Sequence, residues 1–271
     1  FYGPTHSGGV GLRPCRTCCS PPTCRSALGV VDAMKPYLSL TCSLACWFSL
    51  LPLAGGAELA IARTVASLSE AKRLTASFDT WATSFPCAVG VTRSVPVDIF
   101  LVYSRNLTDG TAFSDAARAA TEAVRRGWGQ ADWHSCFRGV HVLEANLSAA
   151  DDIYDPMNMA TNSRWVVGPN NMFRFLLTYF IGSRYDALLT MEIDCTPTRS
   201  NWLHQFEMEA LTAGPMAIRG SGYRGDNLDS FLSILPQSTR RHINGNAIYN
   251  LSSPTLSWLS GKLHADKNGV N

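Results

Sequence analysis

The chain has 271 residues, of which 46% are hydrophobic and 16% are charged, and its formal net charge at pH 7 is +2. A chain of this length and apolar content can form one globular domain with a sizeable core and a short appendage. A net charge so close to zero gives no electrostatic reason to bind nucleic acid, so we expect no nucleic-acid partner.

The first 33 residues do not resemble part of a folded domain. Residues 1–33 are rich in cysteine, proline, arginine and glycine, show no hydrophobic periodicity and precede Met34. We expect them to be a disordered or non-native upstream segment. Their cysteine cluster lacks a second well-spaced ligand pair and a foldable core, so we do not expect a zinc site there. The cluster consists of Cys15, Cys18, Cys19 and Cys24.

Residues 34–57 have the layout of a secretory signal peptide. They begin with Met34 and one positive charge, continue with an uncharged apolar stretch and end in small residues. A signal anchor that stays in the membrane is the alternative, because the uncharged run at 36–57 is nearly long enough to span a bilayer. Both interpretations predict that the rest of the chain faces the lumen of the endoplasmic reticulum or the Golgi. Three glycosylation sequons agree, at Asn106, Asn146 and Asn250.

Residues 58–95 are expected to pack on the main domain as an amphipathic helix followed by a linker. Between residues 58 and 81, apolar residues recur at helical spacing and charged residues occupy the other faces. The apolar positions are Ile61, Val65, Leu68, Leu74, Phe78 and Trp81.

The residues that follow alternate between strand and helix signals. Short β-branched and aromatic runs predict strands, and longer runs with apolar residues three or four apart predict helices. Alternation in this order predicts a doubly wound, mostly parallel α/β sheet with right-handed crossovers. The predicted strands cover residues 97–104, 139–145, 187–193 and 216–219, and the predicted helices cover residues 108–127, 171–180, 201–213 and 227–235.

An acidic pair ends the third predicted strand. The run ALLTMEIDCTP at residues 187–197 is apolar enough to be buried on both faces, yet it contains Glu192 and Asp194 at its end. Ligands of open α/β sheets bind beyond the carboxyl ends of the strands, and residues two apart on a strand point the same way. A divalent cation between the two carboxylates would remove their repulsion. The alternative is structural, with Asp194 or Thr196 capping a helix that starts near residue 197.

Three cysteines lie beyond residue 57, and an oxidising lumen would let them form a disulfide. A bond between Cys87 and Cys136 is allowed and would leave Cys195 free beside the acidic pair. The sequence does not decide the pairing, so the other pairings stay open.

Four short motifs follow one another in the second half of the chain. They are Glu192-Ile-Asp194-Cys-Thr-Pro197, Asn201-Trp202-Leu203, Gly220-Ser-Gly-Tyr-Arg-Gly225 and His242-Ile-Asn-Gly-Asn-Ala247. With these motifs the chain resembles the nucleotide-sugar-dependent glycosyltransferases of the GT-A fold, of a eukaryotic secretory type. The resemblance implies a single catalytic domain with a GT-A (Rossmann-like) sheet at residues 96–258 and a tail at 259–271. It also implies sugar transfer from a nucleotide-diphosphate donor to a glycan or protein acceptor, with Mn²⁺ or Mg²⁺ as cofactor.

The resemblance assigns roles to individual residues. Asp194 would bind the metal, and Glu192 would bind it through water or contact the donor ribose. His242 would complete the metal shell or donate a hydrogen bond within the core. The family's acidic motif is generally Asp-x-Asp, and glutamate in its first position leaves the role of Glu192 less defined than that of Asp194. The residues implied to contact the donor are Tyr103, Ser104, Asn170, Arg174, Glu192, Gly220, Ser221, Asn244, Gly245 and Asn246.

The acceptor side leaves the stereochemistry of transfer open. An inverting enzyme needs a general base near the acceptor, whereas a retaining enzyme does not use one in that way. The candidate bases are Glu207, Glu209, Asp226 and Asp229.

Two other functions also stay open. One is a sugar-binding protein that keeps this fold and has lost turnover, because glutamate replaces the first acid of the motif. The other is a metal-dependent nucleotidyl or phosphoryl transferase, which also needs acids at strand ends. The sequence has no Walker-type glycine and lysine loop, which counts against the second.

Overall fold

A computed structural model describes residues 57–88, 90, 93, 95–154, 164, 166–212, 214–222 and 243–269. All of them belong to the unit Gly55–Asn271. The predictions for residues 1–33, for the signal segment up to residue 56 and for a helix at 227–235 lie outside the described residues. Within the described ranges, no helix combines the length and the apolar character needed to cross a bilayer.

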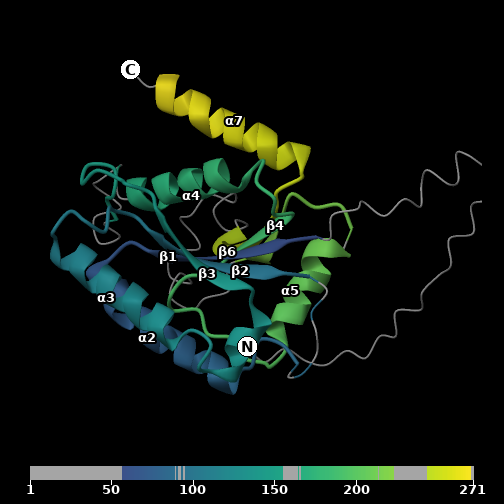
Figure 1. The fold of residues 1–271 in the computed structure, drawn as a ribbon. Coiled ribbons are helices and arrows are strands. Elements are labelled where there is room, and N and C mark those ends of the chain that lie inside the picture. The colour runs from purple at the N-terminus through teal and green to yellow at the C-terminus, as the bar shows by residue number, and fades with distance from the viewer. Residues whose placement is uncertain are drawn as a thin grey trace, which may run out of the picture. The chain divides into compact units, whose positions relative to one another are not determined.

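In the described part of the chain the strands form one six-stranded sheet, in the order β3-β2-β1-β4-β6-β5 (Figure 1). β1, β2, β3 and β4 pair in parallel, whereas β6 runs antiparallel to both β4 and β5. The predicted α/β class with a mostly parallel sheet is therefore confirmed. The strands are β1 (Leu59–Val65), β2 (Val97–Tyr103), β3 (Gly139–Glu144), β4 (Ala187–Thr190), β5 (Ile218–Gly222) and β6 (Ile243–Asn250).

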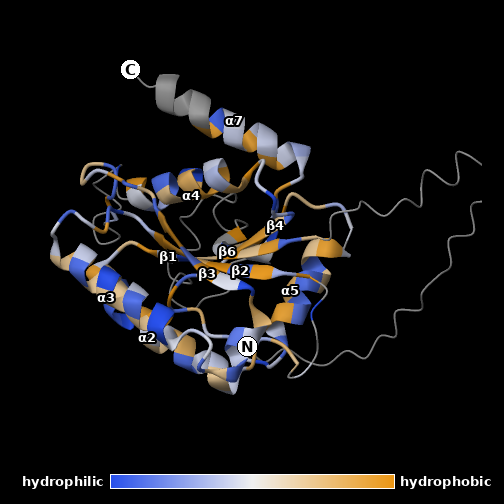
Figure 2. Cartoon of the chain, in the orientation of Figure 1, coloured by the Kyte–Doolittle hydropathy of each residue, from blue (hydrophilic) through white to orange (hydrophobic). Residues whose placement is uncertain are grey.

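Helices cover both faces of this sheet (Figure 1). Alternate residues of β1 explain why, because Ile61 packs toward one set of helices while Ala62 packs toward the other. Figure 2 shows the result, with apolar strands in the centre and helices that are polar on part of their surface. α2 (Leu68–Thr83), α3 (Ala112–Gly127) and α5 (Trp202–Leu211) lie on one face, and α4 (Val167–Phe180) and α7 (Pro254–Gly269) lie on the other.

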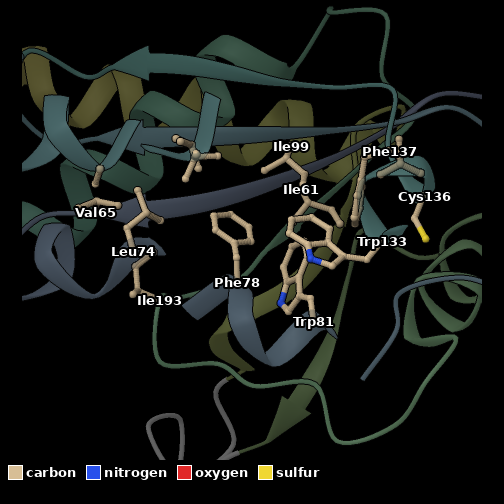
Figure 3. Close-up of a cluster of buried hydrophobic side chains, with 14 of the residues drawn as sticks. Ile61, Val65, Leu74, Phe78, Trp81, Ile99, Trp133, Cys136, Phe137 and Ile193 are labelled. Atoms are coloured by element: carbon tan, nitrogen blue, oxygen red, sulfur yellow. The ribbon is translucent and has the colours of Figure 1, made fainter. Parts of the chain in front are cut away.

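An aromatic cluster fills the space between α2 and the 3₁₀ helix η2 (Asp132–Cys136), on the α2 face of the sheet (Figure 3). The ring centroid of Trp81 lies 4.8 Å from that of Phe78, 5.1 Å from that of Trp133 and 5.0 Å from that of Trp202. Edge-to-face contacts of this kind add to the free energy gained by burying the rings. The cluster therefore ties three segments that are distant in the chain to one side of the sheet.

A disulfide between Cys87 and Cys136 lies next to this cluster, and Cys195 is a free thiol. The pairing that the sequence allowed is the one present. Because the two half-cystines are 49 residues apart, the bond closes a long loop of the unfolded chain.

Removing this disulfide should lower the free energy of unfolding substantially. For a loop of this length the chain-entropy model gives about 4 kcal/mol, and we expect that loss in a Cys87→Ala, Cys136→Ala double variant. Urea unfolding followed by tryptophan fluorescence would measure it. Wild-type protein unfolded in dithiothreitol is the matched control, and it should show a similar loss. A double variant as stable as the oxidised wild type would contradict the prediction.

The predicted helix at residues 58–81 is only half right. Leu59–Val65 is the central strand β1, and the helix begins at Leu68. A strand covered on both faces is apolar throughout, so its residues also fit a helical spacing. The helix start has a local signal, because the Ser67 hydroxyl accepts from the backbone N–H of Glu70 and the Glu70 carboxylate accepts from that of Ser67.

Smaller differences concern where elements end. The predicted strand at 187–193 stops at Thr190. Asn244 and Gly245 belong to strand β6. Most of the predicted tail at 259–271 continues α7. The strands at 97–104 and 139–145 and the helices at 108–127, 171–180 and 201–213 are confirmed with shifted ends, and the strand at 216–219 is found as Ile218–Gly222.

Candidate active site at the carboxyl ends of strands β1 and β4

The strand order changes direction between β1 and β4. From β1 the chain continues outward to β2 and β3, and it then returns to place β4 on the other side of β1. The carboxyl ends of the two central strands diverge at such a point, and ligands of open α/β sheets bind there. In this protein β1 ends at Val65 and β4 ends at Thr190.

Residues 191–195 follow β4 at this point, and we call them the acidic turn. A hydrogen bond from the backbone N–H of Cys195 to the Glu192 carbonyl, 3.1 Å long, closes the turn. Ligand atoms of Glu192, Asp194 and Cys195 all lie within 4.8 Å of one another. The two carboxylates are exposed and the thiol is half-buried. The turn, and not the face of a strand, therefore brings the two predicted carboxylates together.

Strand β6 holds one of these acids in place. The backbone N–H of Glu192 donates to Oδ1 of Asn246 at 2.7 Å, and Nδ2 of Asn246 donates to Oε2 of Glu192 at 3.1 Å. Beside this pair, a Cβ at position 245 would lie 3.1 Å from Oε1 of Glu192, so Gly245 permits the close approach. The structure thus joins three of the predicted site residues, although they come from two distant motifs.

The negative charges of the acidic turn repel one another, and a bound cation would reduce this repulsion. Desolvation raises the pKa of Glu192, and the negative charges of Asp194 and Glu70 raise it further, against the hydrogen bond from Asn246. Burial and the negative charges of Asp194 and Glu192 also raise the pKa of the Cys195 thiol. Two carboxylates that repel each other favour a hard divalent cation, which takes oxygen ligands and leaves positions for water and phosphate oxygens. The residues of the turn therefore fit Mg²⁺ or Mn²⁺.

A buried arginine lies behind the acidic turn, and no sequence motif pointed to it. Arg63 of β1 is fully buried, and its Nη2 donates to the Ser77 hydroxyl at 2.8 Å and to the Ile193 carbonyl at 3.2 Å. Its guanidinium carbon lies 5.5 Å from the ring centroid of Phe78 and 5.6 Å from that of Trp81. Burial lowers the pKa of Arg63 to about 10, so the side chain stays charged at neutral pH.

Arg63 anchors the acidic turn from the core side. Through the Ile193 carbonyl it holds the peptide that lies between the two acids, and the Ile193 side chain packs near Leu74 in the core (Figure 3). Its positive charge also opposes the repulsion between the carboxylates. Nε and Nη1 of Arg63 have no hydrogen-bond partner among the described residues. The only sequence signal for this role was a charged residue within an apolar run.

The end of β2 carries a second polar group. Ser104 is buried, and its hydroxyl donates to Oδ2 of Asp152 at 3.0 Å, while Nε of Arg105 binds the same oxygen at 2.6 Å. Tyr103, by contrast, is fully buried beneath α3, where its hydroxyl lies 2.7 Å from the Thr121 hydroxyl. The prediction that Tyr103 faces the donor is wrong, because the alternation of side chains along β2 turns it into the core.

The remaining predicted donor residues lie on three elements. Asn170 is exposed in the first turn of α4, and Arg174 of the same helix donates to Asn171 at 3.2 Å. Nε of Arg174 is buried without a partner among the described residues. Gly220 lies in β5 and is required by packing, since a Cβ there would lie 2.4 Å from Ile243. Ser221 is exposed beside it.

The candidate bases that the structure describes already have charged partners. Glu207 forms an ion pair with Arg93, and Glu209 forms one with Arg219, which lowers the pKa of Glu209. A general base with a lowered pKa is a weak proton acceptor, so Glu209 is not favoured for that role. The remaining predictions, for Asp226, Asp229, His242 and the side chain of Asn244, lie outside the described residues.

Comparison with known proteins finds similarity among solved structures. No protein-family model matches the chain, and no curated protein does so significantly. Among solved structures, apo mouse xyloside xylosyltransferase 1 shows 14% sequence identity and a TM-score of 0.40, with 78% of this chain and 75% of that chain covered. Glucosyl-3-phosphoglycerate synthase from Mycobacterium tuberculosis, solved with Mn²⁺, uridine diphosphate and glucosyl-3-phosphoglycerate, shows 12% identity and a TM-score of 0.36. That match covers 73% of this chain but only 58% of the synthase. Neither match shows which function the chain has. That inference depends on the chemistry of the acidic turn.

Proposed function

We propose that this protein is a GT-A-type glycosyltransferase that moves a sugar from a nucleotide-diphosphate donor to a glycan or protein acceptor. The observation that carries the proposal is the convergence of Glu192 and Asp194, whose ligand atoms lie within 4.8 Å at the point where the strand order changes direction. Sheets of this kind bind nucleotides there, and a carboxylate pair suits a cation that bridges to a diphosphate.

The residues of the site divide the work between binding and positioning. Asp194 is free to bind Mn²⁺ or Mg²⁺ directly, whereas Glu192 is already oriented by Asn246. Arg63 donates to the Ile193 carbonyl and so holds the acidic turn from the core side. When bound, the cation neutralises the negative charge that develops on the departing nucleoside diphosphate.

We also propose that the chain works in the lumen of the secretory pathway, the endoplasmic reticulum or Golgi. The Cys87–Cys136 disulfide supports this, because such bonds persist in oxidising compartments. Two of the sequons, at Asn106 and Asn146, are exposed, while the Asn250 side chain donates to the Met216 carbonyl at 3.1 Å. A membrane anchor at residues 36–57 remains part of the proposal and lies outside the described residues.

Removing the metal should abolish turnover. We expect the full chain, supplied with a panel of uridine- and guanosine-diphosphate sugars, to release nucleoside diphosphate with Mn²⁺ or Mg²⁺ present. Chelation should lower the rate by on the order of 10²-fold or more, because the leaving diphosphate then loses its counter-charge. Release would be followed with a coupled phosphatase assay, and added Mn²⁺ should restore it.

Other outcomes of this assay would point to other functions. Donor binding without release would favour a sugar-binding protein that has lost turnover. Release that is insensitive to chelation would remove the metal from the mechanism. Transfer of a phosphoryl or nucleotidyl group in place of the sugar would assign the protein to the phosphoryl or nucleotidyl transferases.

A further inference from the structure

A cavity lies on the α4 face of the sheet, away from the acidic turn. Its volume is about 410 Å³, within the range of roughly 300–1,000 Å³ that is usual for small-molecule sites. Part of its wall comes from the loop that precedes β4, whereas the acidic turn follows β4. We call it the ring groove. Its lining residues are Phe100, His141, Tyr179, Ser183, Arg184 and Tyr185.

The walls of the ring groove are mainly aromatic. The Phe100 ring is central, with its centroid 4.9 Å from that of His141, 5.5 Å from that of Tyr185 and 6.2 Å from that of Tyr179. Tyr179 is 45% exposed and the His141 side chain is 44% exposed, so both rings offer surface to a ligand. Aromatic surface flanked by hydroxyl and imidazole groups suits a ligand with an apolar face and polar edges.

The charges next to the ring groove are paired among themselves. Arg138 and Arg184 each form ion pairs with both Glu58 and Asp98. Two cations thus meet two carboxylates, so these four groups together carry no net charge. His141 would add a positive charge only when protonated, and its Nε2 already lies 3.4 Å from Oδ1 of Asp98. The groove therefore favours a neutral ligand.

The same ion pairs make the groove rigid. The Tyr185 hydroxyl donates to Oδ2 of the fully buried Asp98 at 2.6 Å, and the Arg184 guanidinium lies 5.2 Å from the centroid of the Tyr185 ring. Walls fixed before binding reduce the entropy lost when a ligand is held.

We propose that the ring groove is a carbohydrate-binding site for one neutral pyranose unit, separate from the acidic turn. The apolar face of the sugar ring would pack against Tyr179, and its hydroxyls would hydrogen-bond to His141 and Ser183. The site needs neither metal nor nucleotide. It stands whether or not the chain transfers sugars.

Saturation-transfer NMR on the full chain, with methyl glycosides of neutral hexoses and with chelator present, tests this proposal. We expect transfer to at least one neutral sugar, and titration should show binding about tenfold weaker in Tyr179→Ala, the change that losing one aromatic contact gives. His141→Ala should weaken binding similarly. The matched control is Trp258→Ala, which removes an exposed aromatic residue from α7, outside the groove, and should leave binding unchanged.

Three results would overturn the proposal. They are no transfer to any neutral sugar, equal binding in wild type and Tyr179→Ala, or tighter binding of glucuronate than of glucose, which would contradict the charge balance. Nucleotide-sugar hydrolysis assayed in parallel separates the two proposals. Tyr179→Ala should leave hydrolysis unchanged, so a negative result at one site says nothing about the other.

Discussion

Replacing Asp194 with asparagine should lower metal-dependent release of nucleoside diphosphate by on the order of 10²- to 10³-fold, the usual size of losing one group that stabilises developing charge. The amide keeps the shape of the side chain and removes its negative charge. Asp194 is exposed and forms no hydrogen bond within the described ranges, so the structure gives it no role in holding the turn. Kinetics at several Mn²⁺ concentrations would show whether higher metal restores part of the rate.

The unfolding free energy distinguishes a functional loss from a structural one. Asp194→Asn should be at least as stable as the wild type, since it removes no described hydrogen bond and relieves the repulsion between residue 194 and Glu192. Asp79→Asn is the matched control, because Asp79 is an exposed acid on α2 and its replacement should leave both rate and stability unchanged. If Asp194→Asn keeps the full metal-dependent rate, the cation is held by other residues and the proposed site is wrong.

Helices and strands rich in β-branched and aromatic residues were predicted well, because both patterns are recognisable in the sequence. α3 is an example, with buried residues at helical spacing and arginines in its last turn. The strand β1 was missed because its apolar residues Ile61 and Val65 continue at helical spacing into Leu68 of α2. β2 is just as buried but was recognised by its β-branched and aromatic residues. The error hid Arg63, since a charge in a supposed amphipathic helix belongs on its solvent face. Only the neighbouring strands, which pair with β1 on both sides, reveal that this arginine is in the core.

The acidic pair could be located from sequence, because carboxyl ends of parallel strands are recognisable sites. The residue that holds Glu192 in place, Asn246, could not be identified from its spacing in the sequence. The bond between Glu192 and Asn246 joins residues 54 positions apart, and only the motif resemblance singled out both. Tyr103 shows a different limit of prediction from sequence. A strand end was predicted correctly, but a shift of one residue decides between core and edge, and the tyrosine falls on the core side.

Replacing Asp98 with asparagine should destabilise the fold by about 3–5 kcal/mol, the usual result of removing one partner from a buried ion pair. Asp98 is fully buried at the start of β2, where it forms ion pairs with Arg138 and Arg184 and accepts from the Tyr185 hydroxyl. The asparagine leaves both guanidinium groups without this counter-charge. Urea unfolding at pH 7 measures the loss. Equal stability of variant and wild type would mean that Glu58 alone satisfies both arginines.

Acid should remove part of the same stabilisation. Burial would raise the pKa of Asp98, but hydrogen bonds from Arg138 and Tyr185 outweigh it and lower the pKa from 3.8 to about 2. The folded state therefore binds this proton less readily than the unfolded state does. The resulting stabilisation, about 2.5 kcal/mol for a shift of this size, is complete above about pH 4 and is lost as the pH falls toward 2.

The pH dependence separates titration of Asp98 from the general effect of acid. The difference in unfolding free energy between wild type and Asp98→Asn should shrink as the pH falls from 4 to 2, because the wild-type carboxyl becomes neutral like the amide. Asp79→Asn should follow the wild type throughout. If the difference stays constant over this range, the pKa of Asp98 is the same in the folded and unfolded states, and its ion pairs with Arg138 and Arg184 are not what stabilises β2.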